Sequence, residues 1–103
     1  MQNKVREFNK KAGDFASPLS LQARILDIQS ELGELAKECL NCTCYGTKEF
    51  KLTDDLKMEY GDVLYSLLSL ASELNISANE CLQMALKKYQ TRIDKKSTMG
   101  SSN

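Results

Sequence analysis

Glu31-Leu-Gly-Glu34 and its counterpart Glu59-Tyr-Gly-Asp62 each place two carboxylates three residues apart beside an unbroken apolar stripe. Around both segments, apolar residues recur at alternating steps of four and three, which is the period of a helix that buries one face. The first stripe is Leu21, Ile25, Ile28, Leu32, Leu35 and Cys39, and the second is Leu56, Tyr60, Val63, Leu67, Leu70 and Leu74. The spacing predicts two long amphipathic helices joined by a loop of roughly a dozen residues.

The acids fall on the same-handed flank of both stripes. At about 100° per residue, one flank of each helix carries a row of acids. The rows are Asp27, Glu31, Glu34 and Glu38 on the first helix and Asp55, Glu59 and Asp62 on the second. Antiparallel packing, stripe to stripe, brings these flanks to one side, and both acid pairs lie roughly 12 Å from the loop along their axes. We therefore expect an antiparallel helical hairpin whose four central carboxylates meet at one level.

An ordinary salt-bridged helix surface places Lys or Arg three or four residues from each acid, but here Lys37 is the one close basic neighbour of Glu34. Instead, like-charge pairs at i,i+4, such as Asp27 with Glu31, are destabilising. Crowded carboxylates need an external cation, and an all-oxygen ligand set favours a hard ion such as Mg²⁺, with Mn²⁺ as a substitute. The sequence predicts a divalent-metal site at Glu31, Glu34, Glu59 and Asp62. The alternative interpretation is a solvated acidic face, because helix surfaces are often rich in glutamate.

Composition limits the classes of protein that the chain can belong to. A chain of 103 residues with 42% hydrophobic residues fits one domain, placed at residues 1–96, followed by a polar tail at 97–103 that we expect to be disordered. A second apolar shoulder on each long helix predicts a homo-oligomer. Fourteen acids balance fourteen bases, which argues against a surface that binds nucleic acid polymers. The absence of a signal segment and of a long apolar run predicts a cytoplasmic protein without membrane contact.

The four cysteines, Cys39, Cys42, Cys44 and Cys81, are expected to be reduced thiols in that compartment. A zinc site built from them is a weaker alternative, because the chain has no histidine and two of the cysteines fit apolar helical positions.

The opening segment has a helical apolar spacing at Val5, Phe8, Ala12 and Phe15. Packing is the expected role of its aromatic residues. Stacking of Phe8 or Phe15 on a base near the acids is the alternative. Capping residues at Ser17-Pro18, at Thr53 and at Ser77 mark the starts of the three later helices.

Basic residues lie in two places from which they can reach a bound anion. The loop carries Lys48 and Lys51, which contact phosphate or are simply solvated. The last helix is predicted to pack through Leu82, Leu86, Tyr89 and Ile93. Packed across the hairpin, it would bring Lys88, Arg92 and Lys95 towards metal-bound phosphates. The ordinary preference for cations in the last turn of a helix also explains these residues.

Glu31-x-x-Glu34, Glu59-x-x-Asp62 and Lys88-Tyr-Gln-Thr-Arg92 together resemble the MazG-like nucleotide pyrophosphohydrolases, over roughly residues 20 to 94. The resemblance implies an all-α fold of four or five helices, assembled as intertwined homodimers or homotetramers. It also implies Mg²⁺-dependent hydrolysis of (deoxy)nucleoside triphosphates to the monophosphate and pyrophosphate.

The same resemblance implies roles for individual residues. Glu31, Glu34, Glu59 and Asp62 correspond to metal ligands, and one glutamate, with Glu31 and Glu34 as the candidates, also orients or deprotonates the attacking water. Lys88 and Arg92 match a phosphate-contacting pair. The chain departs from some relatives in lacking Trp and His around the base, so base identity cannot be carried over. Related phosphoribosyl-ATP pyrophosphatases usually show a His shortly after the position of Asp62, where this chain has Ser66 and Ser69.

The leading hypothesis is therefore a house-cleaning enzyme that acts on dNTPs or modified nucleotides. A non-catalytic helical assembly module with a solvated acidic rail is the alternative. A relative that binds nucleotide without hydrolysing it is a third interpretation.

Overall fold

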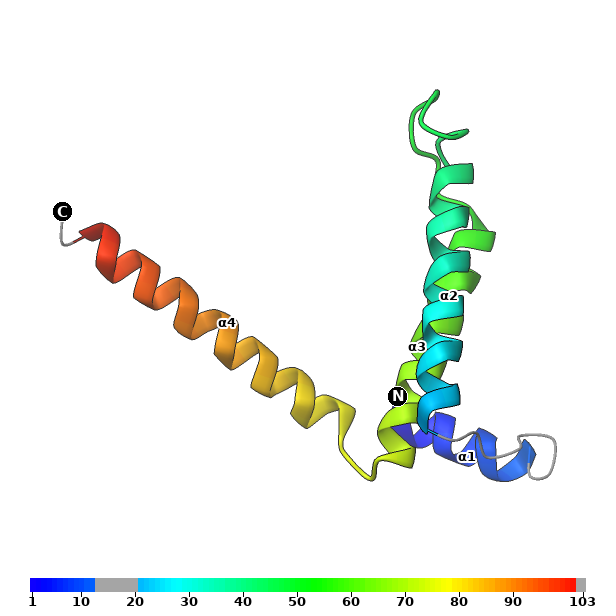
Figure 1. Ribbon diagram of the computed structural model, residues 1–103, viewed down its shortest axis with the longest axis horizontal. Coiled ribbons are helices and arrows are strands. Elements are labelled where there is room, and N and C mark those ends of the chain that lie inside the picture. Colours follow the sequence, from blue (N-terminus) through cyan, green and yellow to red (C-terminus); the bar gives the residue numbers. More distant parts are fainter. Residues whose placement is uncertain (13–20, 102–103) are drawn as a thin grey trace.

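Two long helices form an antiparallel hairpin, and two further helices attach at its open end (Figure 1). The computed structural model describes the backbone of residues 1–12 and 21–101, and the side chains of 1–12 and 21–97. These residues form α1 (Gln2–Ala12), α2 (Leu21–Asn41), α3 (Asp54–Glu73) and α4 (Ala78–Ser101), and they contain no strand. The prediction of an all-α fold is confirmed.

Local capping fixes where the later helices begin and end. The Thr53 side chain accepts a hydrogen bond from the Leu56 amide at 3.1 Å, and the Ser77 hydroxyl accepts one from the Glu80 amide at 3.2 Å. Between α3 and α4, Asn75 takes a left-handed conformation with φ of 55°. This conformation ends α3 and lets α4 start on a new axis. The predicted start at Ser17-Pro18, like Phe15, lies outside the described residues.

Helix α4 projects away from the hairpin (Figure 1). The radius of gyration is 18.3 Å, whereas a compact chain of this length has about 13 Å. The last helix therefore does not pack across the hairpin of its own chain, and its apolar stripe stays about half exposed, from 49% at Leu86 to 61% at Ile93. The helix also continues to Ser101, past the expected end of the domain at residue 96, so the division into domain and tail stays a prediction.

The core of the described chain is small and lies mainly between α2 and α3. Its buried apolar residues are Ile28, Cys42, Val63, Leu68 and Ala71. Much of the predicted stripe remains open, with Ile25 at 50% and Leu67 at 46% exposure. Ser66 and Ser69, which follow Asp62 on α3, are buried at 3% and 0% exposure. Helix α1 and the side chain of Asp27 on α2 cover them.

Polar side chains fasten α1 across α3. The Gln2 amide donates to the Ile76 carbonyl at 2.9 Å and accepts from the Ala78 amide at 2.8 Å, so it bridges the end of α3 and the start of α4. About two turns further along α1, the Asn9 side-chain amide donates to the Ser69 hydroxyl at 3.2 Å. Apolar spacing alone does not reveal such contacts, because amide side chains make them.

None of the helices in the described part of the chain combines the length and the hydropathy that a membrane crossing requires.

Gly33 and Gly61 lie in open surroundings within this chain. A Cβ atom added at either position meets no atom within 4 Å, so no described part of the chain approaches these glycines closely. Gly61→Ala is therefore expected to raise the free energy of unfolding by up to about 1 kcal/mol, the usual advantage of Ala over Gly inside a helix.

Denaturant unfolding without divalent cations measures this effect, with Gly33→Ala as the matched variant on α2. A loss of stability at Gly61 would show that another surface approaches it and would contradict the open surroundings.

Candidate metal centre

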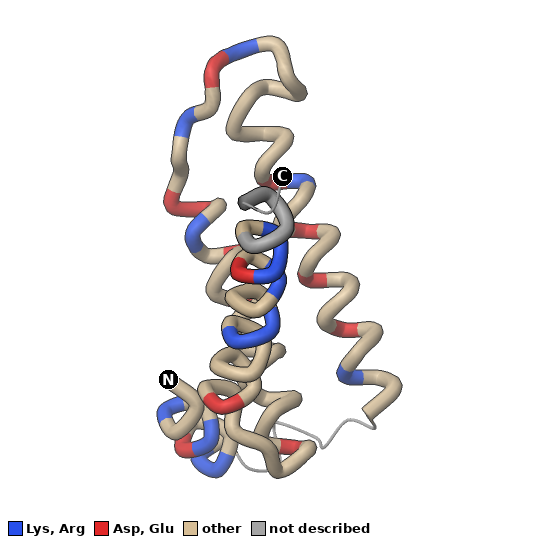
Figure 2. The backbone as a smooth tube through the Cα atoms, turned by 90° about the vertical axis from the view of Figure 1, so that its left-hand side faces the viewer, with Lys and Arg blue, Asp and Glu red and all other residues tan. Residues whose placement is uncertain are grey.

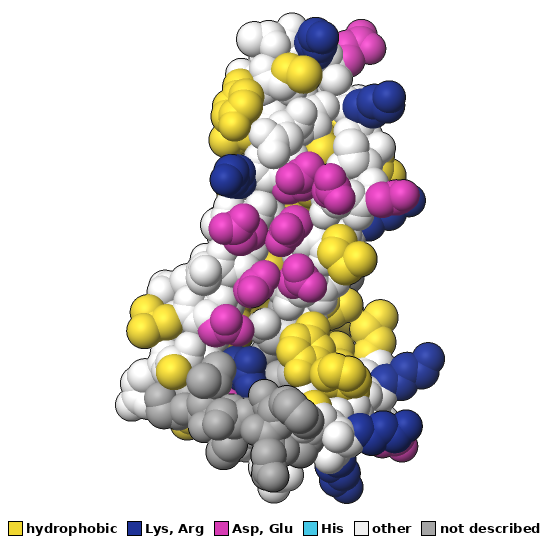
Figure 3. Space-filling model, turned by 90° about the vertical axis from the view of Figure 1, so that its right-hand side faces the viewer, with side chains coloured by type: hydrophobic (Ala, Val, Ile, Leu, Met, Phe, Trp, Pro, Cys, Tyr) yellow, Lys and Arg dark blue, Asp and Glu magenta, His cyan; other side chains and the backbone are white. Residues whose placement is uncertain are grey.

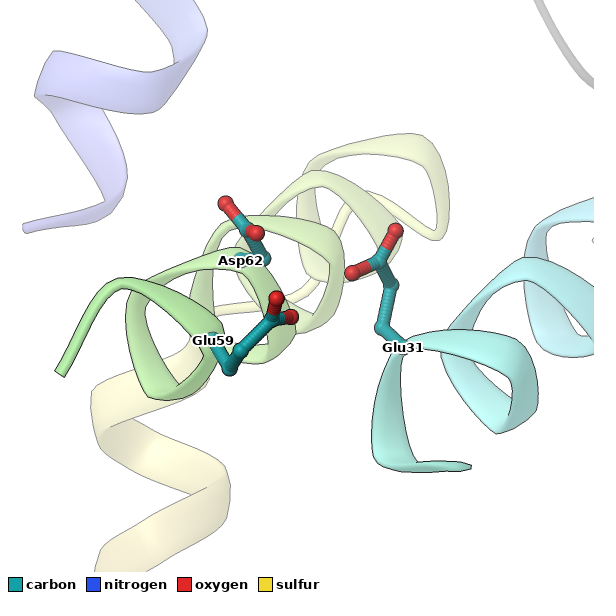
Figure 4. A group of neighbouring side chains, drawn as sticks. All are labelled: Glu31, Glu59 and Asp62. Atoms are coloured by element: carbon teal, nitrogen blue, oxygen red, sulfur yellow. The ribbon is translucent and has the colours of Figure 1, made fainter. Parts of the chain in front are cut away.

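Three carboxylates converge on the exposed face of the hairpin. Glu31 on α2 faces Glu59 and Asp62 on α3 (Figure 4), and each offers an oxygen within 4.8 Å of the others. Glu31 and Glu59 are half-buried, while Asp62 is exposed. The antiparallel hairpin thus brings together three of the four acids that the sequence placed at one level. Carboxylate oxygens at this spacing are able to hold one hard divalent cation.

The electrostatics of the cluster favour an added positive charge. Partial burial, then the nearby Asp62, raises the pKa of Glu31 above its ordinary value, and the same two causes raise the pKa of Glu59. Within the described part of the chain, none of the three forms an ion pair with a basic side chain. Figure 3 shows the acidic side chains as an unbroken band over this face, with basic groups only around it. A bound cation would relieve this mutual repulsion.

Glu34 lies beside the cluster rather than in it. It is not one of the three residues whose oxygens approach one another, yet its charge contributes to the raised pKa of both Glu31 and Glu59. Its side chain is exposed. Glu34 therefore lies near the cluster, and its role as a fourth ligand stays a prediction.

The acidic row is neutralised at the end nearest α1. Arg24 donates from Nε and Nη2 to Glu73 at 3.0 and 2.8 Å, which raises the pKa of Arg24, and its Nη1 lies 3.6 Å from Asp27. Asp27 also accepts a hydrogen bond from the Ser66 hydroxyl at 3.3 Å. Asp27 is thus held by neighbours within the chain, unlike the three clustered acids one turn away.

The candidate phosphate-binding residues do not lie at the cluster in this chain. Lys88 and Arg92 are on α4, which leaves the hairpin, and both approach the ring of Tyr89, at 5.0 and 5.9 Å from its centroid. Lys48 and Lys51 are exposed in the loop between α2 and α3. Contact of any of these four with phosphate stays a prediction.

The cysteines take no part in this cluster. All four are free thiols, and only Cys42 is buried, with its sulfur 3.6 Å from the Thr53 hydroxyl. The group of candidate ligands found among the described residues contains carboxylates alone. An all-oxygen set suits Mg²⁺ or Mn²⁺ better than zinc.

The fold and the site define an all-helical protein with a carboxylate cluster able to hold a divalent cation. Residues 17–96 match the family model for the MazG nucleotide pyrophosphohydrolase domain, and the chain belongs to this family. It is 42% identical over 85 residues to the uncharacterized protein YpjD of Bacillus subtilis strain 168, a match that spans 80% of this chain and 71% of that protein. No solved structure matches the chain.

Divalent cations are expected to raise the melting temperature of the wild-type chain at neutral pH, because they bind the folded cluster and not the unfolded chain. The effect is expected to shrink in acid, where protons compete for Glu31 and Glu59, whose raised pKa values make them protonate first. Differential scanning fluorimetry with and without Mg²⁺ or Mn²⁺, between about pH 4.5 and pH 8, measures both trends. An unchanged melting temperature at every pH would contradict a metal site.

Glu59→Gln tests the repulsion itself. Because the folded pKa of Glu59 lies above its unfolded value, ionisation of this group costs stability as pH rises through that window. Without metal, the variant is therefore expected to melt a few degrees higher than wild type at neutral pH. At low pH the two proteins are expected to melt at the same temperature, because Glu59 is then protonated in both the folded and the unfolded wild-type chain. With Mg²⁺, its melting temperature is expected to rise less than that of wild type. Glu49→Gln, in the exposed loop, is the control that should change neither result.

Proposed function

We propose that the protein is a Mg²⁺-dependent nucleotide pyrophosphohydrolase, which converts (deoxy)nucleoside triphosphates to the monophosphate and pyrophosphate. Membership of the MazG family supports the reaction class. The convergence of Glu31, Glu59 and Asp62 from two helices is the observation that carries the proposal, because their oxygens lie within 4.8 Å of one another and are able to share one hard cation. House-cleaning of dNTPs or modified nucleotides is the expected biological use.

The three clustered carboxylates fit a hard cation by their chemistry and spacing. Glu31, Glu59 and Asp62 would hold Mg²⁺, with Mn²⁺ as a substitute. When bound, the ion supplies charge neutralisation to the phosphate oxygens. The chain's own task is then to place the nucleotide, orient a water molecule opposite the departing pyrophosphate and accept its proton.

Glu34 is the residue best placed to accept that proton. It lies next to the cluster without belonging to the convergent set, so its carboxylate stays available to a water molecule. Water attacks the α-phosphorus while the bond from this phosphorus to the bridging oxygen breaks. One proton of the water passes to the carboxylate, and the bond electrons leave with pyrophosphate. Glu31, the other candidate for this role, is assigned to the metal.

Pyrophosphate release from a panel of canonical and modified NTPs and dNTPs tests the reaction. Turnover is expected only with Mg²⁺ or Mn²⁺, and Glu59→Gln is expected to lower kcat/KM by about a hundredfold or more, since it removes a ligand of the charge-neutralising ion. Glu49→Gln should retain wild-type activity. If no nucleotide is hydrolysed and Mg²⁺ does not change the melting temperature, the alternative of a non-catalytic helical assembly module would be favoured instead.

We further propose that the active unit is a homodimer or homotetramer in which α4 of one copy packs on the hairpin of another. The exposed stripe at Leu82, Leu86, Tyr89 and Ile93 supports this arrangement. Charge supports it too, because α2 and α3 carry nine acids and three bases, whereas α4 carries five bases and two acids (Figure 2). Such packing would bring Lys88 and Arg92 of one copy to the phosphates held by its neighbour.

Mixing two inactive variants tests whether the site is shared. Glu59→Gln removes a metal ligand from the hairpin, and Arg92→Ala removes a phosphate-binding residue from α4. In a mixed dimer, the intact hairpin of the Arg92→Ala copy meets the intact α4 of the Glu59→Gln copy, so one of the two sites is complete. Randomly assembled equal amounts are expected to regain about a quarter of wild-type activity in a dimer. The measurement is pyrophosphate release after joint unfolding and refolding, with each variant alone as the control. No recovery from mixtures that light scattering shows to be oligomeric would contradict a shared site.

A further inference from the structure

The two ends of the acid cluster differ in charge. Towards the loop, Glu34, Glu38 and Asp55 add negative charge, which contributes to the raised pKa of Glu59. Towards α1, the last acid of the row is Asp27, and Arg24 and Ser66 hold it. Beyond it, the buried surface of α3 offers hydroxyl groups rather than charges. A neutral planar group attached to a metal-bound phosphate chain would therefore be better placed towards α1.

An aromatic pair lies at that end. Tyr65 follows Asp62 by one helical turn on α3, which puts their Cβ atoms about 5–6 Å apart. The ring of Phe8 on α1 meets the ring of Tyr65 edge to face, with centroids 6.0 Å apart and an angle of 82°. Phe8 is 58% exposed, so one of the two rings is largely open to solvent. Aromatic surface this open, beside a polar cluster, suits a stacking ligand.

Hydrogen bonds hold this pair in place. The Tyr65 hydroxyl donates to the side-chain oxygen of Asn9, and the Asn9 amide nitrogen donates to Ser69, which is fully buried. One residue of α1 thus fixes the neighbouring Phe8 relative to α3. The aromatic pair is therefore positioned by a buried contact and does not depend on the exposed loop.

We propose that Phe8 and Tyr65 form the wall against which the nucleobase of the substrate packs, and that Asn9 is the positioning residue that sets the angle between them. This inference rests on the proposed function and adds the part of the site that holds the base. Stacking is tolerant of base identity. The pair therefore supplies affinity for the nucleoside.

Binding of a nucleoside triphosphate analogue with a non-hydrolysable α,β-linkage tests the wall without relying on turnover. Isothermal titration calorimetry with Mg²⁺ measures the dissociation constant for adenine, guanine, cytosine and thymine analogues. Phe8→Leu is expected to weaken binding by about tenfold, the size of a lost stack. Phe50→Leu is the matched control, because Phe50 in the loop is 55% exposed and lies at the opposite end of the hairpin.

Tyr65→Leu provides a second variant that removes the other ring, and circular dichroism melting checks that each variant folds. The expected pattern is weaker analogue binding in Phe8→Leu and Tyr65→Leu, with the Mg²⁺-induced melting shift unchanged in Phe8→Leu. Unchanged affinity in folded Phe8→Leu, or a loss in Phe50→Leu instead, would overturn the inference. Wild-type protein that binds the analogue but hydrolyses no nucleotide would refute the proposed reaction and leave the base wall standing, whereas wild-type protein that does not bind it would overturn both.

Discussion

The repulsion among carboxylates across the α2–α3 hairpin is the constraint on which the site depends. Other acids form salt bridges within the chain: Glu73 pairs with Arg24, and Asp54 pairs with Lys57. At the centre of the hairpin, however, Glu31 meets Glu59 and Asp62 with no base between them. Two amphipathic helices that needed only to bury their apolar faces would gain by a Lys or Arg at such a place. Their absence there supports the proposed site for an external cation.

The hairpin and the convergence of its acids could be derived from the sequence because both follow from periodicity and handedness. A helix turns by a fixed angle per residue, so the flank occupied by Glu31 or Glu59 is known once the apolar stripe is known. Antiparallel pairing then determines which flanks meet. The direction of each side chain is not determined in this way, and Glu34 lies beside the convergent set although its height on α2 matched.

The positions of the other two helices could not be derived in the same manner. Helix α1 is held by Gln2 and Asn9, whose amide groups carry no signal in a pattern of apolar residues. The contact of Asn9 also covers Ser69, which is fully buried. Helix α4 shows the reverse case, because its apolar stripe was evident in the sequence while the surface that would cover it is not found in the described chain. A pattern identifies a face that needs a partner but not the molecule that supplies it.

The separation of charge within the chain links these observations. The acids gather on the hairpin, while α4 is predominantly basic (Figure 2) and projects from one end of the hairpin (Figure 1). A net charge of zero therefore conceals two surfaces of opposite sign. The Asn75 turn, with Gln2 bridging it, directs α4 away from the hairpin of its own chain. The basic helix therefore does not meet the acids of the same copy, whereas the proposed oligomer would bring it to the phosphates bound by a neighbouring copy. The geometry of one short connection thus decides that, in the proposed oligomer, the two surfaces of opposite sign meet between copies and not within one.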